Sequence, residues 1–168
     1  MRNAKAFTLV EILIVVVLLG VLAAIVIPAV ANCGTSARES ALAANLNLLR
    51  RFVLVYTSQH MEVAPGYSNG NTSAAPTDAA FRDQALLSSN AHGQTAARGT
   101  AGFNYGPYLS KIPANPFNGL DTIQMLAVGE AFPAGADDSH GWVCQPQTGE
   151  IRPDNTGSDF RGKAYYDY

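Results

Sequence analysis

The sequence predicts an α+β protein with a long N-terminal α-helical spine, the first half of it transmembrane, followed by a C-terminal globular head. Three observations predict this fold class. An apolar block fills residues 7–31, an amphipathic helical stripe follows within residues 35–60, and short strand-like segments separated by Gly and Pro occupy residues 106–168. The 168 residues permit one domain of ordinary size.

Composition excludes several classes of function. Lys and Arg total 11 against 13 Asp and Glu, so the chain lacks the basic surface that nucleic-acid binding requires, and no nucleic-acid partner is expected. Two cysteines are too few for a disulfide-dense scaffold or a four-cysteine zinc site. His60, His92 and His140 fall in separate segments, and no nucleophile elbow or phosphate-binding loop occurs. We therefore expect no enzyme activity and no required cofactor.

The apolar block is long enough to cross a membrane. Every residue from 12 to 27 is apolar or Gly, and as a helix residues 7–31 would extend about 37 Å, more than the roughly 30 Å of a hydrocarbon core. Arg2 and Lys5 precede the block, and the positive-inside rule assigns that side to the cytoplasm. Residues 32–168 are then expected on the other side of the membrane.

Three ordinary explanations of this block compete. A secretory signal peptide could be cleaved after Ala29-Val30-Ala31, but its apolar core would be unusually long and would contain an acid. A lipoprotein signal would use Cys33, but Asn32 stands where a small residue is needed. A signal-anchor helix explains the length of the block and leaves Glu11 unexplained.

Glu11 is the informative residue of the block. A carboxylate in the bilayer costs several kcal/mol unless it is paired or protonated, so its presence suggests a function. If the chain were cut between Ala6 and Phe7, the new α-amine of Phe7 would precede Glu11 by one helical turn. An amine from a neighbouring, staggered helix could neutralise the carboxylate, and this pair would set the register between subunits.

These residues carry a resemblance to a known family. Residues 5–15 (KAFTLVEILIV), followed by an apolar helix and Pro28, resemble the N-terminus of the type IV pilin and type II secretion pseudopilin superfamily. The resemblance implies that a prepilin peptidase removes the leader of residues 1–6 and that Phe7 becomes N-methylated. It also implies that Glu11 guides assembly and that the helix can unwind near Pro28 in the filament. The family usually has Gly before the cut, where this chain has Ala6.

The central part predicts two further helices. An amphipathic helix is expected at about 35–60, with Thr35 and Ser36 as N-cap hydroxyls and an end near His60. Its apolar stripe, expected to pack against the head, is Leu42, Leu46, Leu49, Val53 and Tyr56. Within a variable loop region, 61–105, a short helix is expected from about Thr77 to Leu87, capped by Thr77 or Asp78.

The C-terminal third carries a second resemblance. Residues 106–119 (GPYLSKIPANPFNG) are similar to an element of major-pseudopilin-like proteins, and residues 141–151 look like their closing hairpin, with two short strands around a Pro-x-Thr-Gly turn. A further strand is expected at about Thr122 to Val128. The resemblance implies a pilin-like head with a small antiparallel sheet.

The same resemblance implies one candidate metal. Major pseudopilins often hold Ca²⁺ in a loop between C-terminal strands, and Ca²⁺ takes oxygen ligands. Asp137 and Asp138 could supply them, or alternatively Asp154, Asn155 and Asp159. Neither cluster has the spacing of a standard calcium loop, and a solvated acidic loop is the simpler interpretation.

The two cysteines leave their pairing open. Cys33 follows the membrane segment and Cys144 lies in the expected hairpin. An oxidising envelope compartment would permit a disulfide between them. An intrachain bridge, two free thiols and an intersubunit bond all remain compatible with the sequence.

The function expected from the resemblance is that of a non-catalytic structural subunit of a periplasmic pseudopilus that supports export by a type II secretion system. Its expected partners are further copies of itself, minor pseudopilins, the prepilin peptidase and the inner-membrane assembly platform. The expected location is the inner membrane, in a single pass, with the C-terminal domain in the periplasm. The alternatives are a type IV pilus subunit and a membrane-anchored binding module that does not polymerise.

Overall fold

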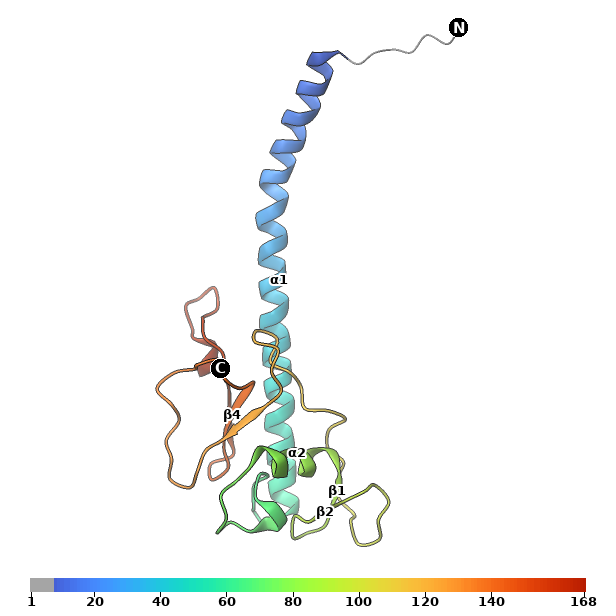
Figure 1. Cartoon of the computed structure of the whole chain (residues 1–168), viewed down its shortest axis with the longest axis vertical. Helices are drawn as coiled ribbons and strands as arrows, with labels where there is room; N and C mark the ends of the chain where they lie inside the picture. Colours follow the sequence, from blue (N-terminus) through green and yellow to red (C-terminus); the bar gives the residue numbers. More distant parts are fainter. Residues whose placement is uncertain (1–7) are drawn as a thin grey trace. The chain divides into compact units, whose positions relative to one another are not determined.

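The structure, a computed structural model, describes residues 8–168, and of residues 28–32 it describes the backbone alone. The chain divides into two compact units, Met1–Arg38 and Glu39–Tyr168, and each is described by itself. Helix α1 begins in the first unit and ends in the second (Figure 1). The elements, in chain order, are α1 (Leu9–Gln59), η1 (Ser68–Gly70), α2 (Asp78–Leu86), β1 (Ser88–Ser89), β2 (Thr95–Ala96), β3 (Ile123–Met125), β4 (Trp142–Gln145), β5 (Glu150–Pro153) and η2 (Tyr165–Asp167).

Helix α1 has no break where the sequence suggested a new start. Its backbone is helical through Pro28 and through Thr35 and Ser36, so the prediction that Thr35 and Ser36 cap a second helix is wrong. A cap satisfies N–H groups only where a helix begins, and here the preceding residues are already helical. The predicted end near His60 is confirmed, because Met61 and Glu62 adopt positive φ angles of 54° and 60° that terminate the helix.

The head is built on the second half of α1. The predicted stripe is confirmed as the centre of the core: all five of its residues are buried, and Phe52 is buried with them. Phe52 meets Phe81 of α2 edge to face, with ring centroids 5.2 Å apart. The residues that pack against the stripe from the rest of the head include Phe81, Ala85, Leu109, Ile112, Ile123, Trp142, Cys144, Ile151 and Tyr165.

Helix α2 begins where the sequence predicted. Thr77 is its N-cap, and the Thr77 hydroxyl accepts a hydrogen bond from the backbone N–H of Ala80 at 3.2 Å. The buried Gln84 side chain accepts from the N–H of Gly66 at 2.7 Å and donates to the carbonyl of Tyr67 at 2.8 Å. These bonds fix the irregular chain after α1 to α2.

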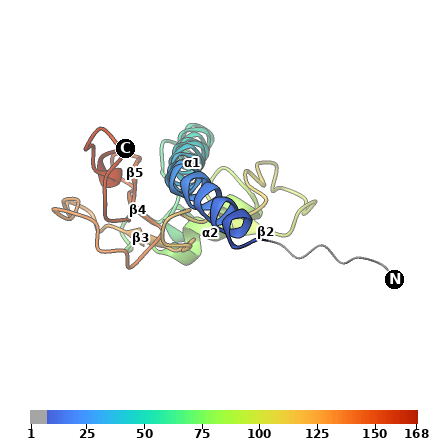
Figure 2. The same ribbon diagram turned by 90° about the horizontal axis from the view of Figure 1, so that it is seen from above.

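The α+β fold class is confirmed. Strands β4 and β5 form the predicted antiparallel hairpin, with Trp142 opposite Pro153 and Gln145 opposite Glu150. β3 confirms the predicted strand near residue 122, but it pairs with β4 in parallel, because residues 126–141 carry the chain back across the end of the sheet. Figure 2 shows β5, β4 and β3 in a row beside the helices, and β1 and β2 form a separate antiparallel pair.

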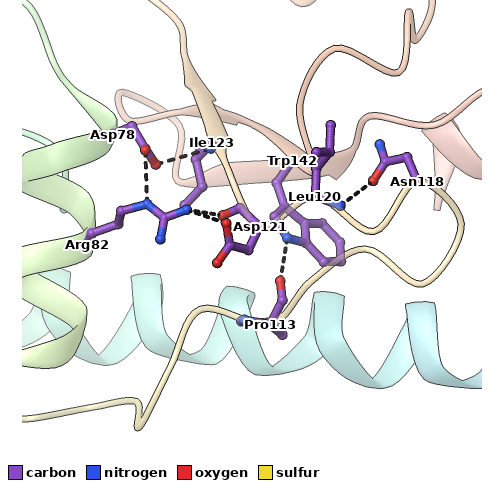
Figure 3. A network of polar contacts seen from close by, with 8 residues as sticks. All are labelled: Asp78, Arg82, Pro113, Asn118, Leu120, Asp121, Ile123 and Trp142. Carbon is purple, nitrogen blue, oxygen red and sulfur yellow. Dashed lines mark hydrogen bonds and ion pairs between the residues drawn. The ribbon is translucent and has the colours of Figure 1, made fainter.

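Polar contacts join α2 and the sheet (Figure 3). Arg82 of α2 bonds Asp78 at 2.9 Å and Asp121 at 2.8 Å, and Asp78 accepts the backbone N–H of Ile123 at 3.1 Å. The Trp142 indole N–H donates to the carbonyl of Pro113 at 2.9 Å. Together these contacts tie α2 to β3 and tie β4 to the proline-rich loop.

Two asparagines give the loop of residues 106–119 a structural role. The fully buried Asn115 donates from Nδ2 to the Gly141 carbonyl at 3.0 Å and to Asn155 Oδ1 at 2.9 Å. Asn118 donates to the carbonyls of His140 and Asp154 at 2.7 and 2.8 Å. The loop therefore fastens the open end of the β4–β5 hairpin, where β4 begins and β5 ends, which explains why this segment carries amide side chains.

His60 closes the far end of α1. Its Nδ1 lies 2.7 Å from the Tyr56 carbonyl oxygen, and its Nε2 lies 2.9 Å from Ser89 Oγ. A carbonyl only accepts, so Nδ1 carries the proton and Nε2 accepts from the Ser89 hydroxyl. Burial lowers the pKa of His60 below its usual value, partly offset by the bond to Tyr56. The neutral imidazole therefore stabilises the head.

We predict a loss of stability in mild acid that depends on His60. The unfolded chain has a histidine pKa of about 6.5 and the folded chain a lower one, so the unfolded state binds more protons in this range. The free energy of unfolding of the full-length protein in detergent should fall as the pH is lowered from 7.5 through 6.5 toward the folded pKa, and urea titrations at several pH values measure it. His60→Gln should flatten this slope, whereas the exposed-site control His92→Gln should keep it. Equal slopes in both variants would contradict the assignment.

Candidate functional site at the start of the apolar helix

Glu11 lies in the first turn of α1 and forms a capping box with Thr8. The Glu11 carboxylate oxygen Oε2 accepts from the backbone N–H of Thr8 and from the Thr8 hydroxyl, each at 3.1 Å. In return, the backbone N–H of Glu11 donates to Thr8 Oγ1 at 3.2 Å. The Thr-x-x-Glu spacing is the sequence signal for this motif, so the role of Thr8, which was not predicted above, is visible in the sequence.

This geometry makes an acid tolerable at the end of an apolar helix. The carboxylate satisfies an N–H group that has no partner within the helix, and it lies at the positive end of the helix dipole. Ala6 and Phe7, the predicted cleavage site, lie outside the described residues. The pairing of Glu11 with a Phe7 amine therefore stays a prediction, and that amine would compete with Thr8 for the same oxygens.

The surface that follows Glu11 is apolar on every side. Leu9–Ile27 is long and apolar enough to cross a membrane, and none of it is buried within its own chain. Its large apolar side chains are more than half exposed, from 51 % for Val15 to 82 % for Leu9. Gly20 has no atom within 4 Å of the position that a Cβ would take, so it leaves space for close approach of another helix.

Both cysteines are free thiols in the structure, which is one of the arrangements that the sequence left open. Cys33 is exposed on α1, whereas Cys144 of β4 is completely buried in the core. Burial raises the pKa of the Cys144 thiol to about 12. A thiol so enclosed and so weakly acidic is a poor partner for disulfide exchange, which requires an accessible thiolate.

The acidic loops predicted for calcium lie side by side. Asp154 accepts the N–H groups of Asp137 at 3.0 Å and His140 at 2.9 Å, and Asp138 accepts the N–H of Thr156 at 3.1 Å. Hydrogen bonds from Ser139 lower the pKa of the Asp137 carboxyl.

The remaining candidates of the second cluster are also engaged in hydrogen bonds. Asn155 accepts from Asn115, and Asp159 accepts the N–H groups of Arg161 and Lys163. Within residues 8–168, no three His, Cys, Asp or Glu side chains are grouped as a metal site would require. In this arrangement the carboxylates cap backbone N–H groups of the loops, and calcium binding at Asp137 and Asp138 stays a prediction.

Comparison with known proteins supports the N-terminal assignment. The family model for the prokaryotic N-terminal methylation motif matches residues 1–27. The Type IV wide pilus major component PilA4 of Thermus thermophilus is 41 % identical over 56 residues, which is 33 % of this chain and 43 % of that protein. The matched part thus spans less than half of the relative's length. No solved structure matches the chain significantly.

The motif and the fold together define the class. The chain carries a prepilin-type methylation motif at its N-terminus, has an α+β pilin-like architecture and is similar to a type IV pilin. The motif and the apolar helix suggest anchoring in a membrane. The predicted resemblance to the type IV pilin-like superfamily is confirmed at this level.

We predict that the capping box stabilises the first turn of α1. Thr8→Ala removes the hydroxyl that accepts from the Glu11 N–H, which should cost about 1 kcal/mol and speed exchange of that amide proton about fivefold. Hydrogen exchange on the full-length protein in detergent micelles measures this rate. The matched control Thr8→Ser keeps a hydroxyl and should exchange like the parent. Identical rates for the two variants would show that no capping box forms.

Proposed function

We propose that this protein is a non-catalytic structural subunit of a type IV pilin-like filament and that it assembles through its N-terminal helix. The observation that carries the proposal is the pairing of an uncovered apolar helix with one acid capped at its start. A simple membrane anchor needs the apolar residues, and an uncharged Gln could complete its capping box without placing a carboxylate in lipid. A subunit that leaves lipid and packs against neighbouring helices needs both the apolar residues and the Glu11 carboxylate.

The physical course of assembly follows from these two features. In the membrane, lipid covers Leu9–Ile27; in a filament, the same side chains would pack against the helices of other copies. The Glu11 carboxylate then needs a positive partner, and the amine released by cleavage between Ala6 and Phe7 would supply it. One charge pair per subunit fixes the axial register, because any other register leaves a buried charge unpaired.

The proposed location and partners extend this course. Arg2 and Lys5 would hold the leader in the cytoplasm, with the helix spanning the inner membrane once and the head in the periplasm. The prepilin peptidase would remove residues 1–6. An inner-membrane assembly platform and minor pseudopilins would act with the processed subunit, and a separate ATPase would supply energy.

Two kinds of filament are candidates, and a specific observation favours each. The resemblance of residues 106–119 to major-pseudopilin-like proteins favours a periplasmic pseudopilus of a type II secretion system. The similarity to a wide pilus component favours a surface type IV pilus, with roles in adhesion, motility or DNA uptake. The amides of the buried Asn115 and the half-buried Asn118 give this segment a defined structural role in the head, so we place the pseudopilus first.

We predict that Glu11→Ala abolishes filaments and leaves membrane insertion intact. Loss of the carboxylate removes the partner of the processed amine and lowers the cost of the lone helix in lipid. Electron microscopy of sheared and membrane-extracted fractions measures filaments, and membrane fractionation measures insertion. Glu130→Ala, which removes an exposed acid of the head, serves as the charge-matched control. Normal filaments from Glu11→Ala would leave a non-polymerising anchor as the better account.

Deletion of the gene should separate the two filaments. A pseudopilus subunit is required for export, so the deletion strain should retain secreted enzymes in its periplasm while keeping its surface pili. A pilus subunit would give the reverse, with pili absent and secretion unchanged. Quantifying extracellular protein and surface filaments in one strain decides between them, and the plasmid-borne gene should restore the affected property.

A further inference from the structure

The loop of residues 157–163 holds an aromatic side chain out from the head. Phe160 is 83 % exposed, and the Arg161 guanidinium lies over its ring, 5.1 Å from the centroid. Asp159 braces the loop by accepting the N–H groups of Arg161 at 2.8 Å and Lys163 at 2.9 Å. A further bridge joins Ser158 to Ala164. The loop therefore presents Phe160 and Arg161 as a fixed projection, here called the Phe160 knob.

A groove lies elsewhere on the head, between α1 and the β4–β5 turn. Its first lobe has a volume of about 420 Å³, is lined by Val53, Leu54 and Thr57 of α1, and is bounded by the turn of residues 146–149. A second lobe of about 430 Å³ adds Val128, and Glu62 and Ala64 line both lobes. The lining is mixed, and each lobe contains a large apolar side chain that no residue of the described chain covers: Leu54 is 70 % exposed and Val128 is 57 % exposed.

The charges of the knob and the groove are complementary. Glu62 lines both lobes, and the ion pairs found among residues 8–168 involve other acids, namely Asp78, Asp121 and Glu150. Arg50 also lines the groove, but its guanidinium donates to the carbonyls of Tyr168 and Ile151, both at 3.2 Å. The knob carries Arg161 beside Phe160, and the Asp159 carboxylate is occupied by backbone N–H groups.

The two features lie at different levels of the head and cannot meet within one copy. The Tyr165 hydroxyl donates to Glu39 at 2.9 Å, which places the chain beside the knob at the beginning of the head's part of α1. The groove lies beside Val53 and Thr57, about 21–27 Å further along the helix from Glu39 at 1.5 Å per residue. A second copy shifted along the helix axis could bring its knob to this level.

We propose that the Phe160 knob of one copy docks into the groove of the next copy along the filament. Phe160 packs against Leu54 and Val128, and Arg161 pairs with Glu62. The contact joins two different surfaces, so it is heterologous, and repetition generates an open filament rather than a closed dimer. This inference rests on the proposed filament function and adds a contact between heads to the contact between apolar helices.

A charge-reversal cycle in the full-length protein tests the contact. Arg161→Glu and Glu62→Arg should each lower the yield of sedimentable filaments about fivefold, because each places like charges together. The double variant should recover most of the parental yield. Arg98→Glu, in another exposed loop, is the matched control and should assemble normally. Parental yields from both single variants, or a double variant no better than either single, would overturn the contact.

Cross-linking provides a second readout that does not depend on assembly yield. In a Cys33→Ser background, Lys163→Cys beside the knob combined with Thr148→Cys on the groove wall should give a ladder of covalent oligomers when filaments are treated with a short bismaleimide. Either cysteine alone should give no ladder. Filaments that form without a ladder in the double variant overturn the head contact and leave the filament function standing. If the parental chain forms no filaments, the proposed function itself fails, and the head contact fails with it.

Discussion

The constraint on which the structure depends is that the apolar surface of Leu9–Ile27 has no cover within its own chain. The apolar stripe on the second half of α1, from Leu42 to Tyr56, is covered within the chain by α2, the β3–β5 sheet and the loop of residues 106–119. The first half must be covered by lipid or by other copies. The acid Glu11 lies at the start of this surface. Whether lipid or other copies cover the helix more stably depends on the partner that the carboxylate finds.

Much of this arrangement could be predicted from the sequence. The spacing of three or four residues between Leu42, Leu46, Leu49 and Val53 predicts one buried helix face. The Pro-x-Thr-Gly turn predicts the hairpin of β4 and β5. Thr77 was identifiable as a cap because a hydroxyl precedes a helical stretch. At Thr35 and Ser36 the same rule failed, since a good capping residue does not create a helix start when the residues before it are already helical.

Other features depend on contacts between distant residues and could not be predicted. Nothing local shows that β3 pairs in parallel with β4, or that Asn115 reaches Gly141 and Asn155. The burial of Cys144 depends on the packing of β4 into the core beside the α1 stripe, which a single strand's sequence does not show. The role of Thr8 could have been predicted, because the Thr-x-x-Glu spacing of a capping box is present in the sequence.

The central claim, that this chain is matured into an assembly subunit, is tested most directly by the intact mass and N-terminal sequence of the protein extracted from envelope membranes. The account predicts a chain that begins at Phe7 and is heavier than its residues by one methyl group. Such a chain has the free positive amine that Glu11 requires. A chain that begins at Met1, or one that begins near Asn32, would contradict the account, because neither places an amine within reach of Glu11 in a packed helix.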